Sequence, residues 1–307
     1  MRTDTRDPMT ARPTLAPPSM EVGAPSALAH QVTDLGDVRL HYVSAGRGDT
    51  VLLLAGFPQT WYAWRKVIPA LAEKYSVVAV DLPGQGDSSR PESGYDTQSM
   101  ADTLRRFIDR LAVGPVFVAA HDVGAWTAYP LAAKHPAVVR RLALLDGGIP
   151  GISLPDALPI QEASRMSFHF LFHLVPDLPE QFIHGREREY VAWFLRAKAF
   201  DPGVFTDADI DEYARCYAAA GGMRAALGWY RAVPLDASQN RELGKTKLAV
   251  PVLALGGRQG ATPNLAEALR AVAVQVEGEP LEDCGHFLPE EQPAAVSERL
   301  LRFFGTD

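Results

Sequence analysis

One strand-to-helix junction constrains this chain more than any other part of its sequence. The apolar run Val116–Ala120 predicts a strand, Asp122 follows after one histidine, and Gly124–His135 has the pattern of a helix. The small residues Ala120 and Gly124 lie two positions to either side of Asp122, where a sharp turn leaves no room for larger side chains. This is the pattern of a nucleophile elbow, a strained turn that presents one side chain above the end of a sheet. We therefore predict that Asp122 is presented to a ligand.

The residue at the tip of this turn is an aspartate, Asp122, and not a serine. A carboxylate needs no base to activate it, and it can attack the carbon of an epoxide or an alkyl halide to form an ester. The presence of Asp122 at this position excludes a serine-type esterase.

Strand and helix patterns alternate before and after residues 147–249, which predicts a mostly parallel, doubly wound sheet. Ligands of such sheets bind at the carboxyl ends of the strands. The expected strands are Val38–Val43, Val51–Phe57, Ser76–Leu82, Pro115–Asp122, Val138–Asp146, Val250–Gly257 and Val274–Leu281, and the expected helices are Trp61–Tyr75, Thr97–Ala112, Gly124–His135, Leu265–Ala273 and Pro293–Phe304.

The alternation stops between Asp146 and Val250, where aromatic residues, prolines and helical patterns take over. We predict a helical cap over residues 150–235, inserted after the strand that ends at Asp146, on a core formed by residues 29–149 and 236–307. Residues 1–28 contain several prolines and predict a disordered leader, and translation could begin at Met20. The expected cap helices are Phe168–Leu174, Pro179–Ala199, Asp207–Ala219 and Met223–Ala232.

Backbone donors are expected beside the nucleophile. Gly56–Pro58 follows a predicted buried strand, and the N–H of Phe57 could point at a developing oxyanion together with the N–H of Val123. Pro58 is a candidate for a cis peptide bond that fixes this turn.

His286 is the strongest candidate for a base, because it follows the last predicted strand and comes after the nucleophile in the chain. It would activate the water that hydrolyses an ester on Asp122. The loop Gly257–Asn264, where many hydrolases carry the acid that orients the base, contains no acid. We therefore predict that Asp146 orients His286. The alternative is that Asp146 only caps the turn that follows it.

Composition limits the partners. The hydrophobic share of 47% and the charged share of 22% are typical of soluble globular proteins. The net charge of −7 argues against a nucleic-acid partner, and no apolar run approaches the ~20 residues that span a bilayer. The two cysteines, Cys216 and Cys284, predict no disulfide framework and a cytoplasmic location.

Four motifs together resemble the epoxide hydrolase branch of the α/β-hydrolases. Within that branch the chain is similar to the bacterial Cif-like enzymes, in which the orienting acid follows the earlier strand and a His/Tyr pair replaces the two cap tyrosines. The likeness covers nearly everything after residue 35. The motifs are Gly56–Trp64, Asp81–Ser89, His121–Ala125 and Gly285–Glu291.

The resemblance implies that an epoxide is opened to a vicinal diol through an ester on Asp122, with no metal or organic cofactor. His169 and Tyr230 match the cap pair and would hydrogen-bond the epoxide oxygen. His173, one turn further along the same predicted helix, competes with His169 for that role. The aromatic residues of the cap favour a small apolar or aryl epoxide, and the resemblance suggests a homodimer.

Two other functions use the same sequence features. Haloalkane and haloacetate dehalogenases share the Asp nucleophile and the His base, but they usually follow the nucleophile with tryptophan or arginine, where this chain has Val123. A non-catalytic protein that binds a small apolar molecule is the third alternative. The chain also departs from the Cif-like pattern. Ala55 stands where those enzymes have a histidine before Gly-Phe-Pro, and Gln292 stands where they have the second cysteine of the pair that would include Cys284. The secretion of Cif-like proteins is therefore not implied for this chain.

Overall fold

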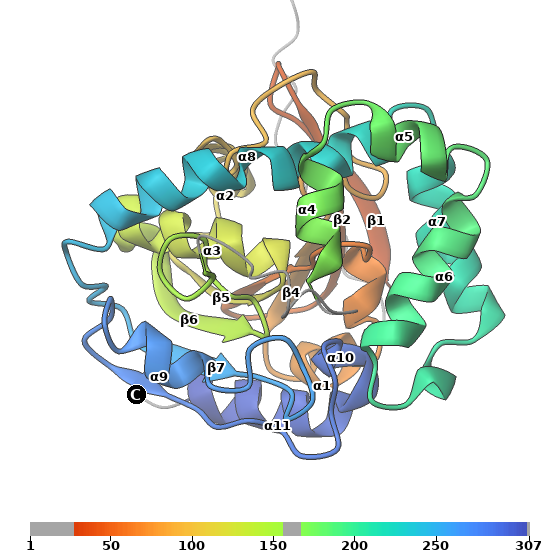
Figure 1. The fold of residues 1–307 in the computed structure, drawn as a ribbon. Helices are drawn as coiled ribbons and strands as arrows, with labels where there is room; N and C mark the ends of the chain where they lie inside the picture. The colour runs from red at the N-terminus through yellow and green to blue at the C-terminus, as the bar shows by residue number, and fades with distance from the viewer. Residues whose placement is uncertain (1–27, 156–166, 306–307) are drawn as a thin grey trace, which may run out of the picture.

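The computed structural model describes residues 28–155 and 167–305. Within them, one sheet of eight strands has the order β1-β2-β4-β3-β5-β6-β7-β8, with helices on both of its faces (Figure 1). Strands β3 to β8 run parallel to one another, and β1 and β2 add an antiparallel edge. The strands are β1 (Ala29–Asp34), β2 (Arg39–Gly46), β3 (Thr50–Leu54), β4 (Ser76–Val80), β5 (Val116–His121), β6 (Val139–Leu145), β7 (Val252–Leu255) and β8 (Val276–Glu277).

A group of helices follows β6 and precedes β7, as predicted for the cap. The long helix α8 crosses above α2 and α3 in Figure 1, and α5, α6 and α7 lie at the right of the view. With the parallel sheet, this insertion confirms the predicted fold class. The cap helices are α4 (Phe168–Leu174), α5 (Leu178–Ile183), α6 (Glu187–Lys198), α7 (Asp207–Ala218) and α8 (Gly222–Leu243).

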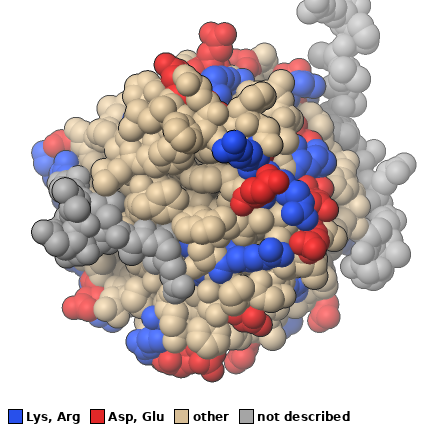
Figure 2. Space-filling view, turned by 45° about the vertical axis from the view of Figure 1, so that its right-hand side comes forward, with Lys and Arg blue, Asp and Glu red and all other residues tan. Residues whose placement is uncertain are grey.

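The surface carries charges of both signs close together. On the face shown in Figure 2, basic and acidic side chains lie next to one another around a broad uncharged area. Ion pairs join Arg188 to Asp211 and Arg215 to Asp87. This is not the single-signed basic field that nucleic-acid-binding proteins present. In the described part of the chain, no helix is long and apolar enough to cross a membrane.

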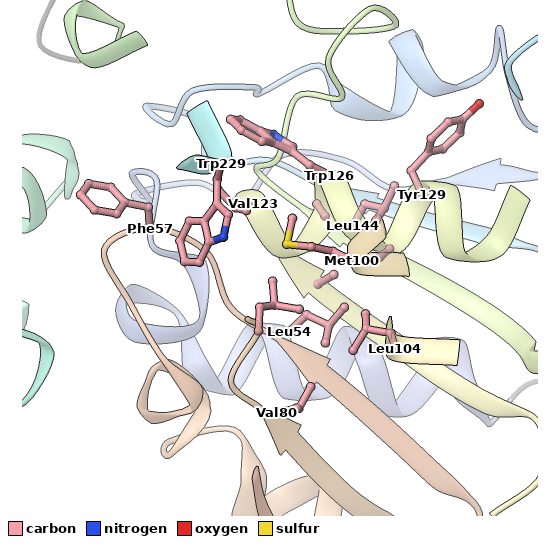
Figure 3. Packing of buried hydrophobic residues seen from close by; sticks show 14 of the residues in the cluster. Leu54, Phe57, Val80, Met100, Leu104, Val123, Trp126, Tyr129, Leu144 and Trp229 are labelled. Atoms are coloured by element: carbon pink, nitrogen blue, oxygen red, sulfur yellow. The ribbon is translucent and has the colours of Figure 1, made fainter. Parts of the chain in front are cut away.

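The sheet separates two hydrophobic cores, because successive side chains of a strand point to opposite faces. Leu52 and Leu54 of β3 belong to one core, and Leu53 between them belongs to the other. The first core lies between the sheet and α2 and α3, with α8 packed on these two helices; Figure 3 shows part of it, with Met100 between Leu54 and Trp126. The helices of the core domain are α1 (Ile68–Ala72), α2 (Thr97–Leu111), α3 (Val123–Lys134), α9 (Leu265–Leu269), α10 (Leu288–Glu291) and α11 (Pro293–Phe304).

Several predicted elements were wrong in detail. The single helix expected over Trp61–Tyr75 is a 3-10 turn, Trp61–Trp64, followed by the short α1, which restarts just before Pro69. Proline is tolerated in the first turn of a helix but not in its interior, which explains the division. The strand expected over Val274–Leu281 pairs only at Val276–Glu277.

Strand β1 was not predicted, because it is a largely exposed edge strand with few apolar residues. Its first residue, Ala29, directly follows the predicted leader, which lies outside the described residues except for Leu28.

The predicted cap helix Pro179–Ala199 is two helices, α5 and α6, which are separated by a turn at Gly185 with φ +76°. The predicted boundary between residues 235 and 236 falls inside α8. The second half of α8 belongs with the core, since Asp236 accepts hydrogen bonds from the N–H and the hydroxyl of Thr97 at the start of α2.

Polar contacts fix the cap to the core next to the predicted base. Arg65, which follows the 3-10 turn, pairs with Asp209 of α7 at 2.7 Å and also with Glu290 of α10. The Tyr213 hydroxyl of α7 donates to Glu290, and Gln59 donates to the Tyr213 hydroxyl at 3.0 Å. Helix α7 is therefore held both by the loop after β3 and by the segment after His286.

Candidate active site

Asp122 occupies the strained turn that the sequence predicted. It lies between β5 and α3 with φ 53° and ψ −123°, a conformation that L residues rarely adopt. Its backbone approaches the sheet closely, because a Cβ at Gly124 would lie 2.7 Å from the carbonyl oxygen of Leu54. The turn is thus possible only with glycine at residue 124, and it presents Asp122 at the carboxyl end of the central strand β5.

The two carboxylate oxygens of Asp122 have different surroundings. The N–H of Phe57 donates to Oδ1 at 2.7 Å, and the Phe57–Pro58 peptide bond is cis, as predicted. Oδ2 lies 3.4 Å from Nε2 of His286. Gly56 permits this approach, because a Cβ there would lie 2.2 Å from Oδ1. One oxygen therefore sits on a backbone donor, while the other faces the predicted base.

Asp122 is a carboxylate over the whole physiological pH range. Burial by itself raises the pKa of Asp122, but the interaction with His286 and the positive charges of His286 and Lys198 outweigh burial and lower the pKa to about 2. The second predicted backbone donor, Val123, is the first residue of α3, where a helix leaves N–H groups without intrahelical acceptors. Its role stays a prediction.

His286 is held on both sides. Its Nδ1 lies 2.6 Å from Oδ2 of Asp146, and its backbone N–H donates to the carbonyl of Lys198 at 3.0 Å. Nε2 has no hydrogen-bond partner among the described residues. Burial lowers the pKa of His286, but the neighbouring carboxylates of Asp122 and Asp146 outweigh it, so the pKa is raised above its ordinary value.

The loop after β7, which contains no acid, holds the side chain of Asp146 in place. Asp146 directly follows β6 with φ 39°, and its carboxylate accepts the N–H groups of Ala261 at 2.7 Å and Thr262 at 2.8 Å, with the Thr262 hydroxyl at 3.1 Å. The loop after β7 thus supplies donors to a carboxylate that comes from the neighbouring strand. These contacts and the bond to His286 go beyond the capping of a turn.

The predicted cap pair is buried together near the nucleophile. The Tyr230 ring of α8 packs edge-on against Phe57 and Trp126, each at 5.7 Å between ring centroids, and against His169 of α4 at 5.3 Å. Burial, followed by the charge of Asp122, raises the pKa of Tyr230 well above its ordinary value. Tyr230 therefore keeps its proton at neutral pH and can donate it.

His173 also packs on Tyr230, at 4.4 Å between ring centroids. Its Nε2, however, lies 2.6 Å from the hydroxyl of Tyr190 and is thereby occupied. Nε2 of His169 is likewise within reach of a donor, Nζ of Lys198 at 3.5 Å, and Nδ1 of both histidines has no hydrogen-bond partner among the described residues. His169 therefore stays the predicted partner of Tyr230, with His173 as the alternative.

Comparison with known proteins agrees with this geometry. The alpha/beta hydrolase family profile matches residues 51–299, most of the chain. The chain belongs to this family. It is 38% identical over 280 residues to the soluble epoxide hydrolase of Corynebacterium sp. (strain C12), which covers 90% of this chain and 97% of that protein. This relative places the chain in the epoxide hydrolase branch, as its motifs predicted.

Solved structures give the same result. The wild-type Cfl2 crystal structure from Burkholderia cenocepacia is 53% identical with a TM-score of 0.87, and the match covers 90% of this chain and 95% of Cfl2. The epoxide hydrolase CorEH without ligand is 37% identical with a TM-score of 0.86, and the match covers 91% of this chain and 99% of CorEH.

Sequence reasoning missed Lys198, which ends α6 and is only 3% exposed. A lysine at the end of an amphipathic helix is typical of a solvent-exposed position, so no local signal marks it as buried.

His121 was predicted to point away from the ligand. It packs beside His286 at 4.7 Å between ring centroids, and its Nε2 lies 2.8 Å from the His286 carbonyl oxygen. Burial lowers the pKa of His121 to about 4, so it is a neutral support for the base.

Proposed function

We propose that this protein hydrolyses a small apolar or aryl epoxide to a vicinal diol through an ester on Asp122. The observation that carries the proposal is the division of the Asp122 carboxylate: Oδ1 rests on the Phe57 N–H, and Oδ2 faces the free Nε2 of His286. A nucleophile, a backbone donor and a base with its acid are therefore arranged around one carbon atom.

In the first step Oδ2 of Asp122 attacks an epoxide carbon, and the bond from that carbon to the ring oxygen breaks. The Tyr230 hydroxyl gives its proton to this oxygen while His169 supports it by a hydrogen bond. The burial of both side chains supports these roles, because hydrogen bonds to a developing alkoxide are strongest where water is excluded.

In the second step Nε2 of His286 takes a proton from water, and the hydroxide attacks the Asp122 carboxyl carbon. The negative charge that develops on Oδ1 is stabilised by the Phe57 N–H and, we propose, by that of Val123. The ester bond breaks, and protonated His286 returns its proton to the departing diol oxygen. The carboxylic acid left on Asp122 gives its proton back to Tyr230, which completes the balance of one epoxide and one water.

Replacing Tyr230 by Phe removes the proton donor while keeping the ring contacts. We expect Tyr230→Phe to slow ester formation about 10²-fold, in the range that general acids contribute. Rapid-quench measurement of the covalent adduct checks this. Tyr129→Phe is the matched control, because Tyr129 is also buried but belongs to α3 and has its hydroxyl near Gly244. Equal effects of the two changes would contradict the role of Tyr230.

The two steps are expected to respond differently to acid. Ester formation needs Asp122 ionised, and its pKa of about 2 means that this step persists on the acid side. Ester hydrolysis needs neutral His286, whose pKa is raised, so its rate rises with pH through that pKa. Once Asp122 is esterified, it no longer carries one of the two negative charges that raise the pKa of His286. The pH midpoint of ester hydrolysis is therefore lower than the pKa of His286 in the free protein.

We therefore expect the adduct to accumulate in the unmodified protein at acidic pH, as measured by intact-protein mass spectrometry after rapid quenching. Asp122→Asn protein at the same pH corrects for uncatalysed opening of the epoxide. A rate of ester hydrolysis that does not change with pH would contradict the role of His286.

The experiment that tests the function is turnover of styrene oxide and a panel of aliphatic epoxides, followed by diol formation. Fluoroacetate and haloalkanes are assayed beside them for halide release. Diol without halide supports the proposal. Halide without diol would transfer the function to a dehalogenase, and binding of epoxides without either product would indicate a non-catalytic protein.

A cytoplasmic location and a homodimer remain proposals about this chain. The location is supported by the two free, buried cysteines, which need no oxidising compartment.

A further inference from the structure

Lys198 brings a buried amino group to the ring-opening pair. Its Nζ lies 3.5 Å from Nε2 of His169 and 4.1 Å from the centroid of the Phe194 ring. Among residues 28–155 and 167–305, no carboxylate forms an ion pair with it. Burying a charged group without a carboxylate partner destabilises a protein, which suggests that this position serves another purpose.

The main chain of Lys198 is attached to the loop of the base. Its carbonyl accepts the N–H of His286 at 3.0 Å. Gly285 permits this close contact, because a Cβ there would lie 2.6 Å from the Lys198 carbonyl oxygen. The end of α6 is thus fixed with respect to His286, and the amino group has a defined position beside His169.

This position decides which nitrogen of His169 carries hydrogen. Burial, followed by the charges of Lys198, His173 and His286, holds the pKa of His169 well below its ordinary value, so the ring is neutral and has one N–H. An ammonium group only donates, so while Lys198 is protonated Nε2 accepts from it and the hydrogen of His169 lies on Nδ1. Within the described residues Nδ1 of His169 has no other partner.

We propose that Lys198 is a positioning residue that holds His169 in the tautomer with hydrogen on Nδ1, so that this N–H is free to bind the epoxide oxygen. The proposal rests on the function proposed above. The other tautomer, with hydrogen on Nε2, would present the lone pair of Nδ1 to the epoxide oxygen. It would repel the developing alkoxide instead of stabilising it. Sequence alone gives no sign of this role.

Because Lys198 can lose its charge, the tautomer of His169 and the rate of ester formation should depend on pH. Burial lowers the pKa of Lys198 to about 7, although the negative charges of Asp122 and Asp146 act in the opposite direction. The ammonium form is the one that can only donate, and it is lost as pH rises through this pKa. The ionisable groups that face Lys198 are His169 and His173 of α4, Asp122 of the elbow, Asp146 after β6, and His286 of the base loop.

The test compares Lys198→Met, which removes the donor, with Lys198→Arg, which keeps it, and with the exposed Lys247→Met as a control. The readouts are the ¹⁵N shifts of His169 in histidine-labelled protein, assigned with His169→Gln, and the rate of ester formation against pH. In the unmodified protein, the rate of ester formation should decline as pH rises above 7, because Lys198 loses its proton. We expect Lys198→Met to lose the Nδ1–H tautomer and to form the ester about 10-fold more slowly below pH 7. Its rate of ester formation should show no decline above pH 7. Lys198→Arg should restore the tautomer and most of the rate.

Unchanged shifts and an unchanged pH profile in Lys198→Met would overturn the proposal. Hydrogen on Nε2 of His169 in the unmodified protein would overturn it as well, even if both variants failed to fold. The ¹⁵N readout needs no substrate, so a failure of the proposed epoxide hydrolysis would be seen separately, as absence of diol from the unmodified protein.

Discussion

Replacing Asp122 by Asn is expected to lower turnover of an epoxide by about 10⁴-fold or more, to the level of uncatalysed opening. The amide has no negative charge and is a poor nucleophile. Its oxygen can still accept the Phe57 N–H that Oδ1 accepts now, so the elbow is expected to remain folded. Diol formation and thermal unfolding are measured together, and only the first should change.

Asp102→Asn is a matched control for this change. Asp102 is also a carboxylate bonded to a histidine, His135, but it lies on the exposed side of α2. We expect this variant to keep its activity. More than one tenth of the activity remaining in Asp122→Asn would contradict a covalent role for Asp122.

Replacing His286 by Gln should separate the two halves of the reaction. Ester formation uses Asp122, Tyr230 and His169 but not His286, and the Phe57 N–H and the charge of Lys198 still favour the carboxylate form of Asp122. Ester hydrolysis loses its base, and we expect it to slow about 10³-fold. The expected result is a burst of one equivalent of consumed epoxide, followed by protein whose mass has increased by one substrate.

His135→Gln, at a partly exposed histidine that follows α3, is the control for this substitution. It should turn over normally without an adduct. Steady turnover by His286→Gln with no trapped ester would mean that a group other than His286 activates the water.

The residues that we propose as nucleophile and base could be singled out because each stands in a local sequence pattern. Asp122 lies between two small residues at a strand-to-helix junction, and such a turn has few solutions. The buried strands were equally clear, since runs such as Val116–Ala120 are apolar on both faces. Asp146 was found by elimination, and the structure gives the physical reason: the loop after β7 contributes N–H groups instead of a carboxylate.

The cap and its contacts could not be predicted to the same depth. The Lys198–His169 contact joins two residues that are 29 positions apart and lie on different helices, and the burial of an amino group depends on packing that no local pattern encodes. The short and exposed elements failed for a related reason: β1 has little hydrophobic periodicity, and Pro69 divides a stretch whose apolar spacing alone favours one helix.

The most direct test of the ester on Asp122 is a single turnover in H₂¹⁸O with the protein in excess over the epoxide. The first diol should contain no ¹⁸O, because its new oxygen comes from Asp122, and the peptide that contains Asp122 should be heavier by one ¹⁸O atom. Diol that carries the label after this first turnover, with unlabelled Asp122, would show that water attacks the epoxide directly and would contradict the mechanism.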